Sequence, residues 1–199
     1  MAEKTIDIAS PILSRNERLA DQLRQRFKET NIYVINVLSS PGSGKTTTIL
    51  GTNERLRDKA GLRCAVIEGD IASDVDAITM KEAGMPAIQI NTGGLCHLEG
   101  NMIMEAVDAF DQNLSIMILS VPEGDDKPIK YPGIFQHAGA QLLNKVDVAP
   151  AFDFDMDRYT KTLDDLNPQA PRFAVSARKG EGMDAWCDWL IGQIEQARA

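Results

Sequence analysis

The chain has 199 residues, enough for about one domain, and its 43% hydrophobic and 25% charged residues are the proportions of an ordinary soluble protein. With 21 Lys and Arg against 29 Asp and Glu, the net charge of −8 argues against binding to the phosphate backbone of a nucleic acid. No apolar stretch is long enough for a signal peptide or for a membrane helix of ~20 residues, and the cysteines are too widely spaced for a disulfide framework. We therefore expect a soluble, cytoplasmic protein without a nucleic-acid or membrane partner.

The first predicted element is an amphipathic helix at residues 14–29. Leu19, Leu23 and Phe27 form a narrow apolar seam along it, which could pack on the chain's own domain or on a second protomer. Packing on its own domain is the simpler of these two options. We interpret residues 1–30 as an N-terminal helical extension and residues 31–199 as a single nucleotide-binding domain.

Short apolar segments then alternate with helical patterns. The segments predicted as strands are residues 32–38, 63–68, 86–90, 114–121, 140–144 and 172–176. Most are apolar at successive positions, as expected of strands that are covered on both faces. The helices predicted between and after them lie near residues 44–60, 74–84, 98–110, 155–166 and 182–197. This alternation predicts a doubly wound α/β fold around a mainly parallel sheet, with ligands at the carboxyl ends of the strands.

The strongest functional signal is a glycine-rich loop that follows the first predicted strand and opens a helix. In such a P-loop, glycines allow backbone N–H groups to point at phosphate oxygens, and the positive end of the helix dipole adds to the attraction. The lysine can reach the β- and γ-phosphates, and the threonine hydroxyl after it can ligate Mg²⁺. The usual pattern begins with glycine where this chain has Ser39, but the groups that contact phosphate are all present. The predicted nucleotide-binding residues of this loop are Pro41, Gly42, Ser43, Gly44, Lys45, Thr46 and Thr47.

The alternative interpretation of this loop is a tight turn without a ligand. The Lys45-Thr46 pair at the offset of a P-loop argues against that alternative.

Two later loops predict which base the nucleotide carries. Asn144, Lys145 and Asp147 follow a predicted strand in the order N-K-x-D, which resembles the guanine-reading motif of GTPases. A carboxylate at Asp147 can accept hydrogen bonds from the ring N–H and the exocyclic amine of guanine, whereas adenine would leave it unpaired. The second loop, which resembles the accompanying S-A-[KR] motif, consists of Ser176, Ala177 and Arg178. Each loop is a weak signal alone, but together they favour GTP and GDP over ATP.

Cys96 and His97 are adjacent at the start of the predicted helix near 98–110. Thiolate and imidazole are ligands that suit Zn²⁺, Ni²⁺ or copper. Two ligands cannot close a four-coordinate site, but a twofold dimer would supply two of each. The alternative is a small buried cysteine beside a histidine that caps the helix.

Together these motifs resemble the HypB family of nickel-inserting GTPases of hydrogenase maturation, and the resemblance runs over nearly the whole chain. Besides the P-loop and the base-reading loops, it includes V-I-E-G-D at 66–70 and N-T-G at 91–93, which leads to C-H-L at 96–98. The segment S-V-P-E-G-D-D-K-P-I-K-Y-P at 120–132 is the most distinctive part. The related urease-maturation GTPases share the fold, but their metal motif is of a Cys-Pro-His type that this chain lacks.

The resemblance implies a G domain that dimerises with GTP and binds Ni²⁺ or Zn²⁺ at the dimer interface through Cys96 and His97. It also implies partnership with a HypA-type nickel metallochaperone and delivery of nickel to the hydrogenase large-subunit precursor. Asp70 would be a switch carboxylate near Mg²⁺ and the attacking water, and with Lys45 it would carry catalysis. Asp74 and Asp76 are weaker candidates, because an Asp-x-Asp at a helix start is more often an N-cap.

The chain departs from the family pattern in three places. It lacks the N-terminal cysteine cluster of some members and the His-rich tract of others, since its only histidines are His97 and His137. Members also carry a further strand ending in E-N-V-G-N-L-x-C-P, which holds the D/E-x-x-G switch for the γ-phosphate and a third cysteine ligand. Here that block is missing, and its loss would remove a ladder of backbone hydrogen bonds from the sheet. We therefore expect that residues are missing between about Val107 and Leu114, which an intact mass well above 21.8 kDa would show.

The favoured function is a GTP-hydrolysing metallochaperone for nickel-enzyme assembly. One alternative is a GTP-gated docking protein with little hydrolysis, because the only D-x-x-G motif, at residues 58–61, lies at a predicted helix end. A urease-type nickel maturation GTPase is another. A small-molecule kinase would need an acceptor-site base and an arginine-rich lid, neither of which the sequence indicates.

Overall fold

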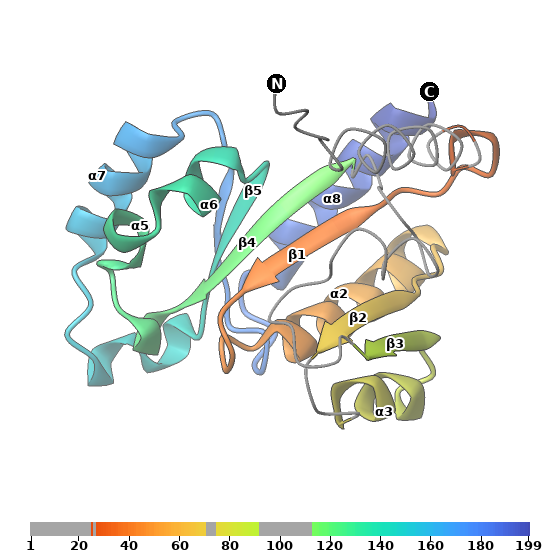
Figure 1. Cartoon of the computed structure of the whole chain (residues 1–199), viewed down its shortest axis with the longest axis horizontal. Helices are drawn as coiled ribbons and strands as arrows, with labels where there is room; N and C mark the ends of the chain where they lie inside the picture. Colours follow the sequence, from red (N-terminus) through yellow and green to blue (C-terminus); the bar gives the residue numbers. More distant parts are fainter. Residues whose placement is uncertain (1–24, 26, 71–74, 92–112) are drawn as a thin grey trace, which may run out of the picture. The chain divides into compact units, whose positions relative to one another are not determined.

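Apolar segments form parallel strands, and amphipathic segments form helices between them (Figure 1). The computed structural model describes residues 25, 27–70, 75–91 and 113–199. The chain divides into two units. One contains residues 1–33 and 65–111, and the other contains residues 34–64 and 112–199. In the first, residues 25 and 27–29 are helical, which agrees with the end of the helix predicted at 14–29.

The second unit contains a four-stranded sheet in the order β1-β4-β5-β6, with every pair parallel. Its strands are β1 (Ile35–Ser39), β4 (Leu114–Ser120), β5 (Ala140–Asn144) and β6 (Arg172–Ala174). Ser39 lies opposite Ile118, and Ser120 lies opposite Asn144. The carboxyl ends of these neighbouring strands therefore meet at one edge of the sheet, where the loops that follow them come together.

Helices cover both faces of this sheet (Figure 1). On one face lie α2 (Lys45–Ala60) and α8 (Met183–Arg198), which pack against each other. On the other face lie α5 (Lys127–Lys130), α6 (Pro132–His137) and α7 (Met156–Leu166). Two 3₁₀ segments, η1 (Val121–Glu123) and η2 (Val146–Ala151), complete the connections. Short helices at 127–137 were not expected from the sequence.

The core beneath α6 and α7 follows from the alternation of side chains along β4. Met117 and Leu119 point to this face and pack with Phe135, Tyr159 and Leu163. Each of these side chains is at most 6% exposed. Burying them provides the main driving force for closing the helices onto the sheet.

The first unit contains a two-stranded parallel sheet of β2 (Val66–Asp70) and β3 (Ala87–Asn91), joined through α3 (Val75–Glu82). Met80 in α3 and Met85 in the turn after it are fully buried. This β-α-β arrangement is the one that the alternating pattern predicted.

The doubly wound, mainly parallel α/β fold is thus confirmed, and the observed strands and α-helices other than α5 and α6 overlap the predicted ones. The predicted helix near 98–110 and residues 14–24 of the first helix lie outside the described residues. Within the described part of the chain, β1 pairs only with β4, and all five of its residues are half-buried. By comparison, the five residues of the interior strand β5 are all buried. The segment predicted to be missing falls at 107–114, mostly outside the described residues, and stays a prediction.

Candidate nucleotide-binding site

The loop after β1 has the backbone conformation that a phosphate cradle needs. Gly42 and Gly44 have φ of 79° and 91°, in the left-handed region that glycine adopts without steric cost. A Cβ on Gly44 would overlap the Asn144 amide, so the position also requires the absence of a side chain. Gly44 caps α2 without any side-chain hydrogen bond, and the first turn of α2 carries no acidic residue. The N-terminus of this 16-residue helix therefore presents the positive end of its dipole at the loop, where it favours an anion.

The side chains of this loop fit a phosphate and a metal ion. Lys45 and Thr46, in the first turn of α2, are half-buried. The hydroxyls of Thr48 and Thr52 donate to carbonyls four residues earlier, whereas that of Thr46 has no such partner in the described part of the chain. The hydroxyl oxygens of Ser39 and Ser43 are buried there without a hydrogen-bond partner. Buried polar groups are normally paired, so these orphans indicate that the loop is shaped for a ligand.

Asn144 connects the phosphate loop to both base-reading loops. Its side-chain amide donates to the Ser43 carbonyl at 2.9 Å, and its side-chain oxygen accepts from the Ala177 N–H at 3.1 Å. The neighbouring Lys145 has φ of 61° and donates from Nζ to the Gly42 carbonyl at 2.6 Å. The sequence therefore predicted residues that the fold brings together, although they come from three separate loops.

Asp147 lies beside Ser176 and Lys179 of the second base-reading loop. Its side chain is 13% exposed, and its carboxylate lies 3.5 Å from the ammonium of Lys179. A hydrogen bond with Ser176, followed by the charge of Lys179, holds the pKa of Asp147 below its ordinary value. The carboxylate is therefore ionised at neutral pH and able to accept from two N–H groups of a base. Arg178 is exposed, whereas Lys179, which was not singled out from the sequence, takes part in this cluster.

Contacts between α2 and α8 hold the second base-reading loop in place. Arg55 donates to Asp184 at 3.0 Å and to the Gly180 carbonyl at 3.4 Å. The indole N–H of Trp186 donates to the Thr52 hydroxyl at 3.0 Å. Because these contacts join residues more than 120 positions apart, no local pattern could have pointed to Arg55 as a positioning residue.

The remaining predicted site residues are not joined to this cluster by the described structure. Asp70 ends β2 in the first unit, and its side chain lies outside the described residues, as do Cys96, His97 and Asp74. Among the residues described, no three or more His, Cys, Asp and Glu side chains gather as metal ligands, and Cys64 and Cys187 are free thiols. The D-x-x-G at 58–61 ends α2, where Gly61 caps the helix and Asp58 accepts from Arg57. It is therefore a helix terminus rather than a phosphate switch.

In the part of the chain that the structure describes, no helix combines the length and the apolar character needed to cross a bilayer.

Comparison with known proteins gives consistent matches. Residues 33–121 match the family described as CobW/HypB/UreG, nucleotide-binding domain. The hydrogenase maturation factor HypB of Escherichia coli K12 is 39% identical over 214 residues, which cover 96% of this chain and 73% of the relative. The hydrogenase/urease maturation factor HypB of Helicobacter pylori is 32% identical over 219 residues, covering 96% and 89%.

The crystal structure of Helicobacter pylori HypB in complex with nickel superposes with a TM-score of 0.81 at 30% identity, over 92% of this chain and 96% of that one. The alignment with the Escherichia coli relative is longer than the 199 residues of this chain, so that relative carries residues within the aligned region that have no counterpart here. This difference agrees with the prediction of a missing segment and does not by itself place it.

Proposed function

Because this chain belongs to the HypB family of hydrogenase maturation factors, we propose that it binds and hydrolyses GTP and helps to insert nickel into the [NiFe]-hydrogenase large-subunit precursor. The observation that carries the nucleotide part is the connection of three loops through Asn144. Its two hydrogen bonds tie the loop that carries Asp147 to the phosphate loop and to the second base-reading loop. A ligand with a guanine base and a phosphate chain satisfies both ends of this arrangement.

The residues of α2 would hold Mg²⁺ and the triphosphate. The Thr46 hydroxyl is available to the metal ion, and Lys45 and the first N–H groups of the helix would neutralise the β- and γ-phosphates. When bound, Mg²⁺ would neutralise part of the charge of the triphosphate. Asp70 is the residue proposed to orient the attacking water. Since phosphoryl transfer needs mainly positioning and charge, these groups suffice for slow hydrolysis.

The substitution Asp147→Asn tests the assignment of the base. An amide donates where the carboxylate accepted, so the variant should lose GTP affinity and gain affinity for xanthosine triphosphate, which carries a carbonyl in place of the guanine amine. Calorimetric titration of both nucleotides measures the change. Unchanged GTP affinity without binding of the xanthine nucleotide would reject guanine recognition by this loop.

We further propose a homodimer that forms with GTP and shares a Ni²⁺ or Zn²⁺ site built from Cys96 and His97 of both protomers. A HypA-type metallochaperone would supply the nickel, and the cytoplasm would be the site of delivery. In this proposal residues 31–199 form the GTPase domain and residues 1–30 its helical extension. The crystal structure of the Helicobacter pylori relative in complex with nickel supports the choice of metal.

A GTP-gated docking protein with little turnover is the second candidate. It is favoured by the sequence's lack of a D/E-x-x-G motif at a position suited to sensing the γ-phosphate. A single-turnover hydrolysis assay with excess protein separates the two candidates, because a switch of this kind would keep GTP intact for as long as it stays bound. The urease-type alternative is distinguished by testing which apo-enzyme, hydrogenase or urease, the nickel-loaded protein activates.

A further inference from the structure

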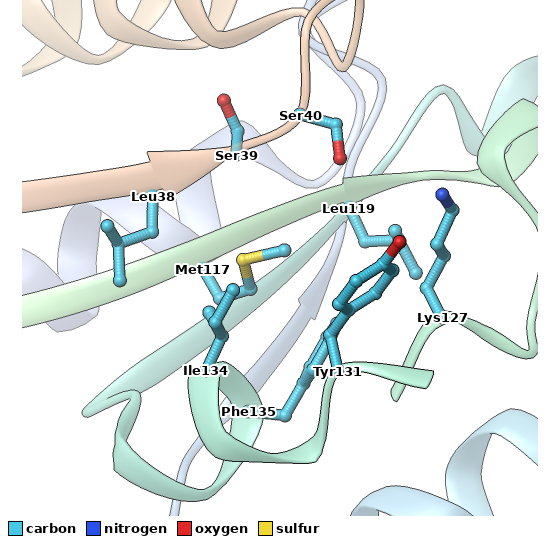
Figure 2. A pocket seen from close by; sticks show the side chains of 9 residues that line it. All are labelled: Leu38, Ser39, Ser40, Met117, Leu119, Lys127, Tyr131, Ile134 and Phe135. Carbon is cyan, nitrogen blue, oxygen red and sulfur yellow. The ribbon is translucent and has the colours of Figure 1, made fainter. Parts of the chain in front are cut away.

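A pocket of about 230 Å³ lies beside the start of the phosphate loop (Figure 2). Its walls are mostly apolar, and its polar lining residues are Ser39, Ser40, Lys127 and Tyr131; Figure 2 shows the Lys127 ammonium on the same side of the pocket as the Tyr131 hydroxyl. The apolar walls come from β1, β4 and α6 and consist of Leu38, Met117, Leu119, Ile134 and Phe135. The function described above does not use this pocket.

The topology explains why Lys127 faces the phosphate loop. β1 and β4 are parallel neighbours, with Ser39 opposite Ile118, so the chain leaves both strands at the same end of the sheet. After β4 it makes the 3₁₀ segment η1 and then begins α5 at Lys127. Lys127 therefore lines one pocket together with Ser39 and Ser40, which begin the phosphate loop.

The charges around Lys127 leave its ammonium available to an anion. Two acidic residues immediately precede it, but each is already paired with another cation. Asp125 is buried and accepts from the guanidinium of Arg158, and Asp126 lies 2.5 Å from the ammonium of Lys130. Lys127 itself contacts the Tyr131 ring, with Nζ 5.5 Å from the ring centroid. In the described part of the chain no ion pair joins a carboxylate to Lys127, so its ammonium is the charged group among the residues that line the pocket.

We propose that Lys127 binds the terminal phosphate of GTP, which would make it a second cation of the phosphate site beside Lys45; this proposal rests on GTP being the nucleotide. Apolar walls weaken dielectric screening, so a cation at the rim attracts a phosphate oxygen more strongly than one in open solvent. An ammonium that donates to an anionic phosphate oxygen forms a charge-assisted hydrogen bond. GDP ends before this position, so Lys127 distinguishes the triphosphate from the diphosphate.

The same chemistry could serve inorganic phosphate released after hydrolysis. The two sources differ in what they require, because a terminal phosphate is held by the nucleotide, whereas a free phosphate would have to bind beside GDP. Titrating phosphate into the GDP complex therefore separates them. The proposal commits to the terminal phosphate of the bound nucleotide.

The experiment compares wild type, Lys127→Met, Lys127→Arg and the control Lys161→Met, which removes an exposed positive charge on α7. Calorimetry with Mg²⁺ present measures binding of GDP, of GDP with inorganic phosphate added, and of a non-hydrolysable GTP analogue. Lys127→Met should lose roughly 10- to 150-fold in affinity for the analogue, the factor expected for a hydrogen bond to a charged group, and should keep its GDP affinity within about twofold. Lys127→Arg should retain most of the analogue affinity, and Lys161→Met should match wild type.

Equal losses for GDP and analogue in Lys127→Met, or no loss for either, would overturn the role of Lys127. Phosphate that binds the wild-type GDP complex and is lost in Lys127→Met, with analogue affinity unchanged, would overturn it in favour of a free-phosphate site. Failure of the wild type to bind any guanine nucleotide would instead reject the proposed function, so the two failures are distinguishable. Thermal unfolding of Lys127→Met should match wild type, which shows that the half-buried lysine acts on the ligand and not on the fold.

Discussion

The side-chain amide of Asn144 donates a hydrogen bond to the carbonyl oxygen of Ser43, although the two residues lie 101 positions apart in the chain. Asn144 is 2% exposed, and its oxygen accepts in turn from the Ala177 N–H. One buried amide thus fixes the phosphate loop and the second base-reading loop relative to the strand that carries it. The relative position of these two loops therefore depends on this side chain, together with the contacts of Lys145 and Arg55.

Asn144→Ala should therefore affect both stability and nucleotide binding. The substitution removes two hydrogen bonds and leaves a carbonyl and an N–H without partners in a buried place, which should lower the free energy of unfolding by about 2–4 kcal/mol. Guanine-nucleotide affinity should fall more than tenfold, because the phosphate and base loops lose their common support. Urea denaturation and calorimetric titration measure the two effects.

Asn167→Ala is the matched control for this substitution. Asn167 also places its side-chain amide against backbone carbonyls, those of Phe135, Gln136 and Ala138, but it lies at the end of α7, away from the site. It should lower stability while leaving nucleotide affinity within about twofold. A parallel loss of affinity in both variants would show that Asn144 acts through stability alone.

The two left-handed glycines of the phosphate loop should differ in their tolerance of alanine. Gly42 has φ of 79°, and a Cβ there would meet nothing within 4 Å, so Gly42→Ala should cost only the backbone strain of about 1–2 kcal/mol. At Gly44 the same strain is joined by overlap of the new Cβ with the Asn144 amide. Gly44→Ala should therefore be the more destabilising and should abolish tight nucleotide binding. Equal unfolding midpoints for the two variants would contradict this difference.

Recognition of the guanine amine should survive mild acid because of the environment of Asp147. Its pKa is lowered, first by the hydrogen bond with Ser176 and then by the charge of Lys179, so the carboxylate stays ionised down to a pH below its ordinary value of 3.8. Any stability that the contacts of Asp147 with Ser176 and Lys179 contribute is present above pH 3.8 and is lost as the pH falls through the lowered pKa. The ratio of GDP to inosine diphosphate affinity, in which phosphate titration cancels, should stay constant from pH 7 to pH 5.

Ser176→Ala should raise the pKa of Asp147 towards its ordinary value and make that ratio fall at a higher pH than in wild type. A ratio that falls identically in both proteins would show that the hydrogen bond with Ser176 does not control the carboxylate.

The ion pair of Asp125 and Arg158 should control acid stability more than the exposed pairs do. Asp125 is buried and accepts from Arg158 and from the Asp155 N–H, and the pKa of Asp125 is lowered chiefly by the hydrogen bond with Arg158. Its contribution to stability is therefore present above its ordinary pKa and is lost as the pH falls through the lowered value. Arg158→Met should lower the thermal midpoint at pH 7 and should approach wild type in acid, where Asp125 is protonated in both proteins.

Lys130→Met serves as the comparison, because its partner Asp126 and Lys130 itself are both exposed. Removing such a surface pair should change the midpoint little at any pH. If Lys130→Met and Arg158→Met gave the same pH profile, burial of Asp125 would have no special effect.

The parts of the fold that were predictable are those in which local pattern and burial agree. The strand at residues 140–144 was predicted to the residue, because it is an apolar run between Gly139 and the polar N-K-x-D motif and is buried throughout. The short helices α5 and α6 were not predicted, since Pro128 and Pro132 interrupt any helical period. The turn before α5 is held instead by a contact across the fold, the pair of Asp125 with Arg158, and α6 is held by the burial of Phe135.

The residues of the candidate site likewise include some that were predictable from the sequence and some that were not. Its loops were recognisable because each lies directly after a strand and has a fixed order of residues. The roles of Arg55, Lys127 and Lys179 were not recognisable, because each depends on a partner that only the topology brings near. Sequence spacing predicts which residue types can contact a ligand, but the charge that surrounds them is set by long-range pairing.

Nucleotide and metal should be coupled if the proposed site between protomers exists. With Cys96 and His97 of two protomers as ligands, one metal ion should bind per dimer, and GTP should favour that dimer. Thermodynamic linkage then requires that the metal raise GTP affinity in the dimer by the factor by which GTP raises metal affinity, roughly 5- to 150-fold for a coupling of about 1–3 kcal/mol. Metal affinity should fall as the pH drops through the titration range of cysteine and histidine, because both ligands must lose protons to bind.

Cys96→Ala should remove most metal binding and leave GTP binding by the monomer intact, and His97→Ala should do so less completely. Metal titration with and without a non-hydrolysable GTP analogue, followed by size-exclusion chromatography, provides the test. Equal metal uptake by wild type and Cys96→Ala, or uptake of one metal per chain without dimerisation, would reject a shared site.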